Sequence, residues 1–339
     1  MLQPGPAHPH RPRPAADLAE RLGVDAAAVE AWCDAGLAVD GDGLIDPFAA
    51  ANWLCWHGLD QCPVLARHWR RYLAWFRPHM QGRDVARQVT VQRHHRCYLP
   101  RPAARVTWWL PQLTDTLGQR VVARPSLPGP VAGLADALGD DGRFMRLSWA
   151  APGRTPAVQA CDVVDCVPLP PRPDVQVARV MAELIAEFRY VYRHHAPQDL
   201  QEPVRMEGSC FDLSRAFGQR LSDLGRPWRL LAGVVADDRL ANPHFWLEVE
   251  GVDGWFPADP TLPAIARMLG EDPTPWLAAY ATGSDARRIA LGVVGAPAAD
   301  LPVPPAVASC LGEVVADGVS AWACLDWVCG ECSWTFTGP

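Results

Sequence analysis

The chain has 339 residues, of which 49% are hydrophobic, and this length predicts two or three domains rather than one core. Charged residues make up 20% and the formal net charge is -7, so a general attraction to nucleic acid or to an anionic membrane is not expected. No run of about twenty apolar residues is present, and Met1–Pro14 lacks the apolar centre of a signal peptide. We therefore expect a cytoplasmic protein whose eleven cysteines are reduced thiols.

Residues 1–80 are predicted to form a small helical domain. Apolar residues recur at helical spacing on both sides of Asp25, and aspartate commonly caps the first turn of a helix. The stretch Leu18–Leu37 resembles the helix-turn-helix of excisionase-like and MerR-like proteins. Its second helix contains Asp25, Glu30 and Asp34 and no basic residue, whereas binding to phosphates needs Lys or Arg. We therefore predict docking to a protein partner for this segment and no nucleic-acid partner.

Residues 86–172 change to a pattern that is typical of short β-strands. Several runs rich in β-branched and aromatic residues are separated by Gly and Pro, which interrupt strands and form turns. These runs are Arg105–Pro111, Gln119–Ser126, Arg143–Ala150 and Val163–Pro170. They predict a β-sandwich-like domain.

A proline-rich linker, Pro170–Val175, separates this domain from a further domain predicted over residues 173–300. That domain opens with a helix, because the run Val177–His194 carries one apolar stripe. A second helix is predicted within Gly208–Gly225, whose apolar side chains share one face. Cys210 stands at its start, where unpaired amides and the helix dipole favour an anion. The Cys210 thiol is therefore predicted to ionise readily.

Two strands follow that helix. Pro243–Gly251 alternates between two faces, and Gly254–Thr261 is a second extended run. The short turn between them predicts a hairpin. A hairpin centred there places His244 nearly opposite Asp259, and cross-strand neighbours lie about 5 Å apart at Cβ. We therefore expect an imidazole–carboxylate hydrogen bond.

The motifs around these residues resemble the transglutaminase-like superfamily, whose core is related to papain. In chain order the matching motifs are Gly208-Ser209-Cys210, Gly225–Arg229, His244–Glu248, Gly254–Thr261 and the strand-like run Arg287–Gly295. Arg226 departs from the family, which has an apolar residue there. The β-rich segment resembles the β-domain that precedes the core in bacterial members. That second likeness is carried by Trp108–Pro111, Gln119–Val122 and Asp136–Asp140.

This resemblance implies an α+β fold in which a papain-like core, with a helix packed on an antiparallel sheet, follows the β-domain and the helical segment. It also implies that Cys210 is the nucleophile, His244 its base and Asp259 the residue that orients the histidine. Trp246 and Trp255 lie in the motif region and are interpreted either as walls of the acyl pocket or as core residues.

We predict a cysteine-dependent hydrolase that cleaves a peptide or amide bond through a thioester. Its substrate would be a peptide, a protein or a carrier-bound acyl group, and no cofactor is predicted. An acyltransferase of the transglutaminase type, which passes the acyl group to an amine, uses the same residues and is the alternative. A non-catalytic interaction scaffold is the second alternative.

Residues 301–339 are predicted to form a C-terminal extension that packs on the core. Cys329 and Cys332 form one C-x-x-C pair, whereas a zinc site of this type needs two such pairs. A packed strand or helix is therefore favoured, and no metal is predicted. The other clusters, His94-His95-x-Cys97 and His194-His195, are expected at the ends of secondary structure rather than at a metal.

Overall fold

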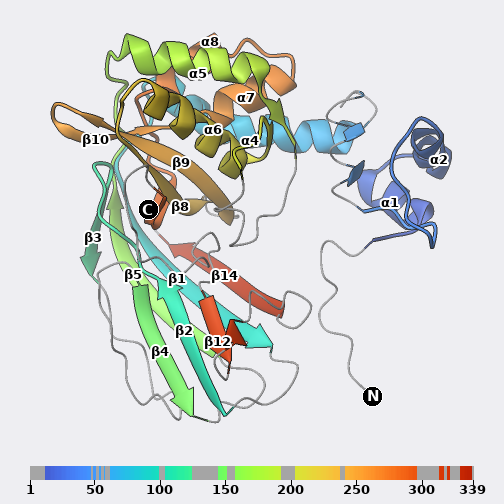
Figure 1. The fold of residues 1–339 in the computed structure, drawn as a ribbon, viewed down its shortest axis with the longest axis horizontal. Helices are drawn as coiled ribbons and strands as arrows, with labels where there is room; N and C mark the ends of the chain where they lie inside the picture. Colours follow the sequence, from blue (N-terminus) through green and yellow to red (C-terminus); the bar gives the residue numbers. More distant parts are fainter. Residues whose placement is uncertain are drawn as a thin grey trace.

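The computed structural model describes residues 12–46, 49–50, 53–54, 57, 62–98, 104–123, 144–150, 157–191, 203–236, 241–295, 313–316, 319–320 and 329–337. The fold mixes helices and sheets, as the predicted α+β class requires. Two helices stand near the N-terminus, two sheets form a β-rich body, and a third sheet is covered by helices (Figure 1). Within the described part of the chain, no helix is long and apolar enough to cross a membrane.

The N-terminal helices α1 (Ala15–Leu22) and α2 (Ala26–Asp34) pack around a small core of their own. α1 ends at Gly23, whose φ of 66° is the left-handed conformation common at helix ends. Asp25 caps α2, because its carboxylate accepts a hydrogen bond from the Ala27 amide at 3.1 Å. The buried residues of this core include Leu18, Val29, Trp32, Leu37 and Ile45.

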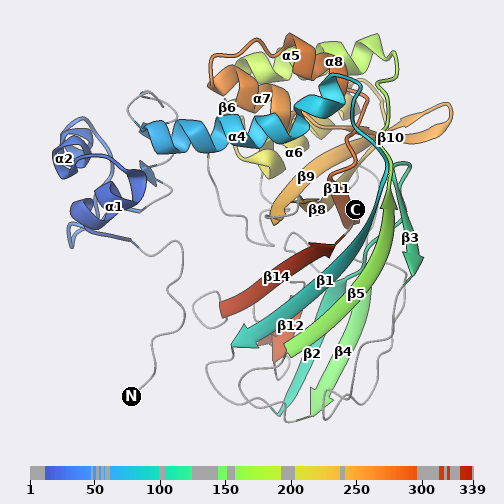
Figure 2. The same cartoon turned by 180° about the vertical axis from the view of Figure 1, so that it is seen from behind.

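Helix α4 (Pro63–Met80) belongs to a different core. Its apolar face packs against α7 (Thr261–Met268) and α8 (Thr274–Tyr280), and Figure 2 shows α4 reaching from the side of α1 and α2 to these helices. Phe76 and Tyr280 are among the residues buried there. Helix α4 thus shares a core with α7 and α8, and the domain bounds predicted for residues 1–80 stay a prediction.

The β-rich body consists of two four-stranded antiparallel sheets. One sheet has the order β14-β1-β5-β3 and the other has the order β13-β12-β2-β4. The strands of the first sheet are β1 (Arg87–Tyr98), β3 (Gln119–Ala123), β5 (Ala157–Cys166) and β14 (Cys329–Thr337). Those of the second are β2 (Arg105–Pro111), β4 (Phe144–Ala150), β12 (Glu313–Ala316) and β13 (Val319–Ser320).

The C-terminal segment contributes strands to both of these sheets. β14 pairs with β1, from Thr90 opposite Thr337 to Tyr98 opposite Cys329. In the other sheet, β12 pairs with β2. The described strands of residues 301–339 thus lie on the β-rich body, and the extension predicted for the whole of 301–339 stays a prediction. Without β14 and β12, β1 and β2 would be edge strands with unpaired backbone groups, and such edges favour pairing with any available strand.

The third sheet carries the candidate site and has the order β10-β9-β8-β11. Helices α5 and α6 cover one of its faces, where Phe217 of α6 shares a buried cluster with Phe245 and Leu247. The elements are α5 (Val175–Glu187), β6 (Arg189–Tyr190), β7 (Glu207–Gly208), α6 (Cys210–Asp223), β8 (Trp228–Ala236), β9 (Ala241–Gly251), β10 (Gly254–Ala258) and β11 (Arg288–Gly295).

The opposite face of this sheet meets the β-rich body. Gln119, at the start of β3, donates a hydrogen bond to the Ala290 carbonyl at 3.0 Å and accepts one from the Ala290 amide at 2.8 Å. The sheet that carries the candidate site thus lies between helices on one side and the β-rich body on the other. Apolar residues buried between the two include Val89, Val91, Val234, Ile289 and Leu291.

Candidate active site

Cys210 is the first residue of α6, and its side chain is partly exposed. A capping box builds this helix start: the Ser209 hydroxyl accepts from the Asp212 amide, and the Asp212 carboxylate accepts from the Ser209 amide at 3.1 Å. Gly208 makes room for it, because its φ is 147° and a Cβ there would stand 1.9 Å from a carboxylate oxygen of Asp212. Local sequence therefore holds the thiol at a helix N-terminus, where the dipole favours negative charge.

His244 and Asp259 come from the hairpin of β9 and β10, which has the predicted turn. The register pairs Ala258 with Leu247. Asp259 directly follows β10 and so lies level with Trp246, two residues from His244. The sequence predicted that the two residues lie nearly opposite each other. In the structure they are diagonal neighbours across the two strands. His244 Nε2 nevertheless lies 2.7 Å from Asp259 Oδ2.

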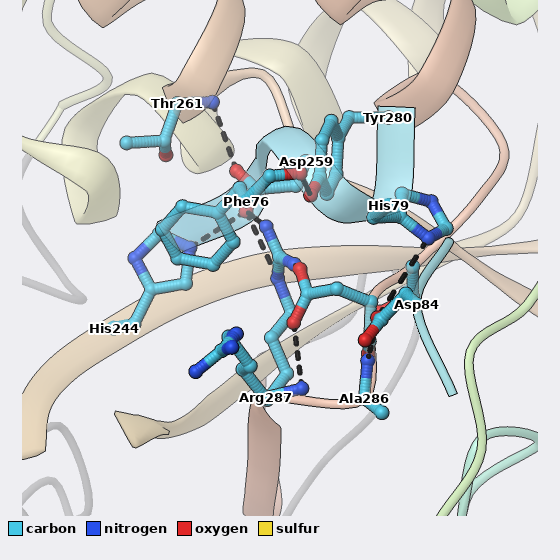
Figure 3. Close-up of polar contacts among 12 residues, drawn as sticks. Phe76, His79, Asp84, His244, Asp259, Thr261, Tyr280, Ala286 and Arg287 are labelled. Carbon is cyan, nitrogen blue, oxygen red and sulfur yellow. Dashed lines mark hydrogen bonds and ion pairs between the residues drawn. The ribbon is translucent and has the colours of Figure 1, made fainter. Parts of the chain in front are cut away.

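The Asp259 carboxylate is buried and makes several polar contacts, shown in Figure 3. Oδ1 accepts a hydrogen bond from the Thr261 amide at 2.8 Å. Oδ2 accepts from His244 and also from the Arg288 guanidinium, whose Nε lies 3.1 Å away. Arg288 forms a second ion pair with Asp285. The side chains of this ionic group are at most 5% exposed.

The charges of this group follow from burial and pairing. Burial by itself would lower the pKa of His244, because a buried cation loses its hydration. The Asp259 carboxylate and the adjacent Cys210 outweigh burial and raise the pKa of His244 to about 9. Burial likewise favours neutral Asp259, but His244 and Arg288 outweigh it and hold the pKa of Asp259 well below its ordinary value. At neutral pH the imidazole is therefore protonated and the carboxylate ionised.

Cys210 lies beside His244, and its side chain raises the pKa of the imidazole. Because Nε2 is engaged by Asp259, Nδ1 is the nitrogen left for the thiol. The Trp246 ring stacks on the imidazole, with centroids 5.8 Å apart and planes 19° apart, and this restricts its rotation. The structure thus brings together the three residues that the sequence predicted as a catalytic trio.

The two tryptophans predicted near the acyl pocket have different surroundings. Trp246 is buried with Leu231 and Ala290 and lines a cavity of about 20 Å³ next to Arg288. A space of that size holds roughly one water molecule and is too small for an acyl group. Trp255 is partly exposed, and the Arg229 guanidinium lies 4.8 Å from its ring centroid. A pocket role for either ring stays a prediction.

Arg288 is a site residue that the sequence pattern does not single out. It opens β11, a run that is otherwise apolar, and so has the pattern of an ordinary strand residue. Its guanidinium lies over the rings of Phe76 and Tyr280, 5.4 and 4.8 Å from their centroids. The available signal was Asp285 shortly before it, because a buried charge in an apolar run needs a partner.

Among the described residues, no group of three or more His, Cys, Asp or Glu side chains is placed to hold a metal ion. Cys329 and Cys332 lie on β14, and His94 and His95 lie on β1, where only the backbone is described. His194 and His195 fall outside the described residues. The absence of a metal therefore stays a prediction.

No protein-family model matches the chain, and no curated protein matches it. Among solved structures, the chain is similar to one from Cytophaga hutchinsonii that is described as a "putative cysteine protease". The likeness covers 74% of this chain and 91% of that one, with a TM-score of 0.43 and 12% sequence identity. At this level of similarity, the function has to be inferred from the residues of the site.

Proposed function

We propose that this chain is a cysteine-dependent hydrolase that cleaves a peptide or amide bond through a thioester on Cys210. The observation that carries the proposal is the line of contacts from the Cys210 thiol through His244 to the buried Asp259 carboxylate. A thiolate is the nucleophilic form of cysteine, and a protonated imidazole is the acid that an amine leaving group needs. The helix N-terminus and the pair of His244 with Asp259 favour these two forms.

In the acylation step, the Cys210 thiolate attacks the carbonyl carbon of the substrate, and the carbonyl π electrons move to the oxygen. The Cys210 backbone amide, at the first turn of α6, is positioned as one donor to that oxyanion. When the tetrahedral intermediate collapses, the C–N bond breaks and His244 gives its proton to the departing nitrogen. The step leaves a free amine, a thioester on Cys210 and a neutral imidazole that Asp259 keeps oriented.

In the deacylation step, His244 accepts a proton from a water molecule whose oxygen attacks the thioester. The C–S bond breaks, the carboxylic acid leaves, and the thiolate and imidazolium are restored. A primary amine in place of that water would form an amide by the same steps, which is the acyltransferase alternative. Hydrolysis is preferred because it needs no second binding site.

The test offers the full-length protein a panel of peptide anilides and glutamine-containing peptides, with and without a millimolar primary amine, and identifies the products by mass spectrometry. The proposal expects free acid whether or not amine is present, and no product from Cys210→Ala or His244→Ala. Amide product with negligible free acid would assign acyl transfer instead. Absence of product, together with alkylation of Cys210 that does not depend on His244, would assign a non-catalytic scaffold.

A further inference from the structure

One carboxylate oxygen of the site serves two cations. Oδ2 of Asp259 accepts a hydrogen bond from His244 Nε2 at 2.7 Å. The same atom accepts from Arg288, with Nε at 3.1 Å and with Nη2 as a second donor. Oδ1 accepts from the Thr261 amide. The imidazole and the guanidinium therefore share the charge of a single oxygen.

The Arg288 guanidinium is held in place by its surroundings as well as by Asp259. It is 5% exposed, forms an ion pair with Asp285 and lies over the rings of Phe76 and Tyr280. Planar guanidinium groups stack well on aromatic rings, and such contacts restrict their movement. Phe76 belongs to α4, so a helix from the N-terminal part of the chain supplies one of these ring contacts (Figure 3).

We propose that Arg288 is a positioning residue of the candidate active site, which fixes the Asp259 carboxylate and shares its Oδ2 with the His244 imidazole. This role rests on the cysteine-dependent function proposed for the chain. A fixed carboxylate keeps the imidazole oriented toward Cys210. A carboxylate that already neutralises a guanidinium also attracts a second cation less strongly, so the imidazolium can release its proton to a leaving group.

Other titratable groups face this pair from neighbouring elements. Asp84 accepts a hydrogen bond from the Ala286 amide at 2.8 Å, and His79 of α4 lies beside it. Burial and the Arg288 charge lower the pKa of His79 below its ordinary value. Burial raises the pKa of Tyr280 far above its ordinary value. Asp285 is engaged in its ion pair with Arg288, so a change in the alkylation rate between pH 7 and 10 reports on His244.

Iodoacetate gives a readout that needs no substrate. It is an anion, so it reacts fast with the Cys210 thiolate only while the adjacent His244 is protonated, and its rate falls along an alkaline limb as His244 loses that proton. In the wild-type protein this limb is expected near pH 9. Arg288→Gln is expected to move it upward by about 1 pH unit, because one competing cation has been removed from Asp259. Substrate turnover should fall roughly tenfold to a hundredfold with KM unchanged, because the imidazole is less well oriented.

Two variants separate this role from a general loss of stability. Arg288→Lys keeps the charge but not the planar fork, so it should leave the limb within about 0.3 pH units of wild type and recover part of the turnover. Arg229→Gln is the matched control. Like Arg288, Arg229 pairs with a buried carboxylate, since its Nε lies 2.6 Å from Oε2 of Glu248. Its guanidinium also lies over an aromatic ring, that of Trp255. Its loss should lower the urea midpoint without moving the limb.

The outcomes are decisive in both directions, with circular dichroism used to verify folding. An alkaline limb that stays in place or moves downward in Arg288→Gln overturns the role of Arg288. If that variant does not fold, wild-type turnover in Arg288→Lys overturns it instead. If replacing His244 leaves the alkylation of Cys210 unchanged from wild type, the proposed function is refuted. The failure of the Arg288 role and the failure of the proposed function are therefore distinguishable.

Discussion

Replacing Asp259 by asparagine removes one negative charge from the buried ionic group and keeps the shape of the side chain. In the wild-type protein, burial opposes the charged imidazole, and Asp259 with Cys210 raises the pKa of His244 from 6.5 to about 9. That difference of roughly 2.5 pH units corresponds to about 3 kcal/mol of proton affinity. With the carboxylate gone, only Cys210 opposes the effect of burial. We therefore expect the pKa of His244 to fall to its ordinary value or lower in Asp259→Asn.

The assay is the alkaline limb of Cys210 alkylation by iodoacetate. In Asp259→Asn the limb should move from near pH 9 to about 6.5 or lower, and turnover at pH 8 should fall by roughly a hundredfold or more. Glu248→Gln is the matched control, because Glu248 is a second buried carboxylate, located on β9, and pairs with Arg229. Its limb should not move. A limb that stays above pH 8 in Asp259→Asn would refute the reasoning that this carboxylate holds the imidazole proton.

Iodoacetamide at neutral pH should label Cys210 before Cys33 and Cys166, because burial raises the pKa of both other thiols, that of Cys166 to about 11; equal labelling in peptide mass spectra would contradict this. Gly208→Ala should lower the free energy of unfolding by about 2 kcal/mol or more, since it strains a positive φ and displaces the Asp212 cap. Ser209→Ala loses only the cap hydroxyl and should lower the free energy of unfolding by about 1 kcal/mol. Equal urea midpoints for Gly208→Ala and wild type would show that position 208 tolerates a Cβ. The full-length protein should not bind duplex DNA in a low-salt polarisation assay, because α2 lacks basic residues; binding that weakens steeply with salt would show the opposite.

The sequence by itself determined the local parts of the site. The capping box at Ser209 and the position of Cys210 on the first turn of α6 depend on residues that are close in the chain. The hairpin of β9 and β10 depends on its short turn and on strand alternation, so His244 and Asp259 could be predicted as partners. Local contacts of this kind follow from spacing and turn chemistry. Their diagonal placement follows from the same turn, because pairing Gly254 with Gly251 puts Asp259 opposite Trp246, two residues from His244.

Only the tertiary structure decided which distant residues complete the site and the sheets. Arg288 reaches Asp259 from another strand, and Phe76 reaches Arg288 from a helix that the sequence assigned to a separate domain. The strands β12 and β14 likewise return from the C-terminal segment to pair with the β-rich body. These contacts join residues that are far apart in the chain, and periodicity along the sequence does not specify which surfaces meet. They form because buried charges need partners and sheet edges need strands, and those requirements are met only when the whole chain is packed.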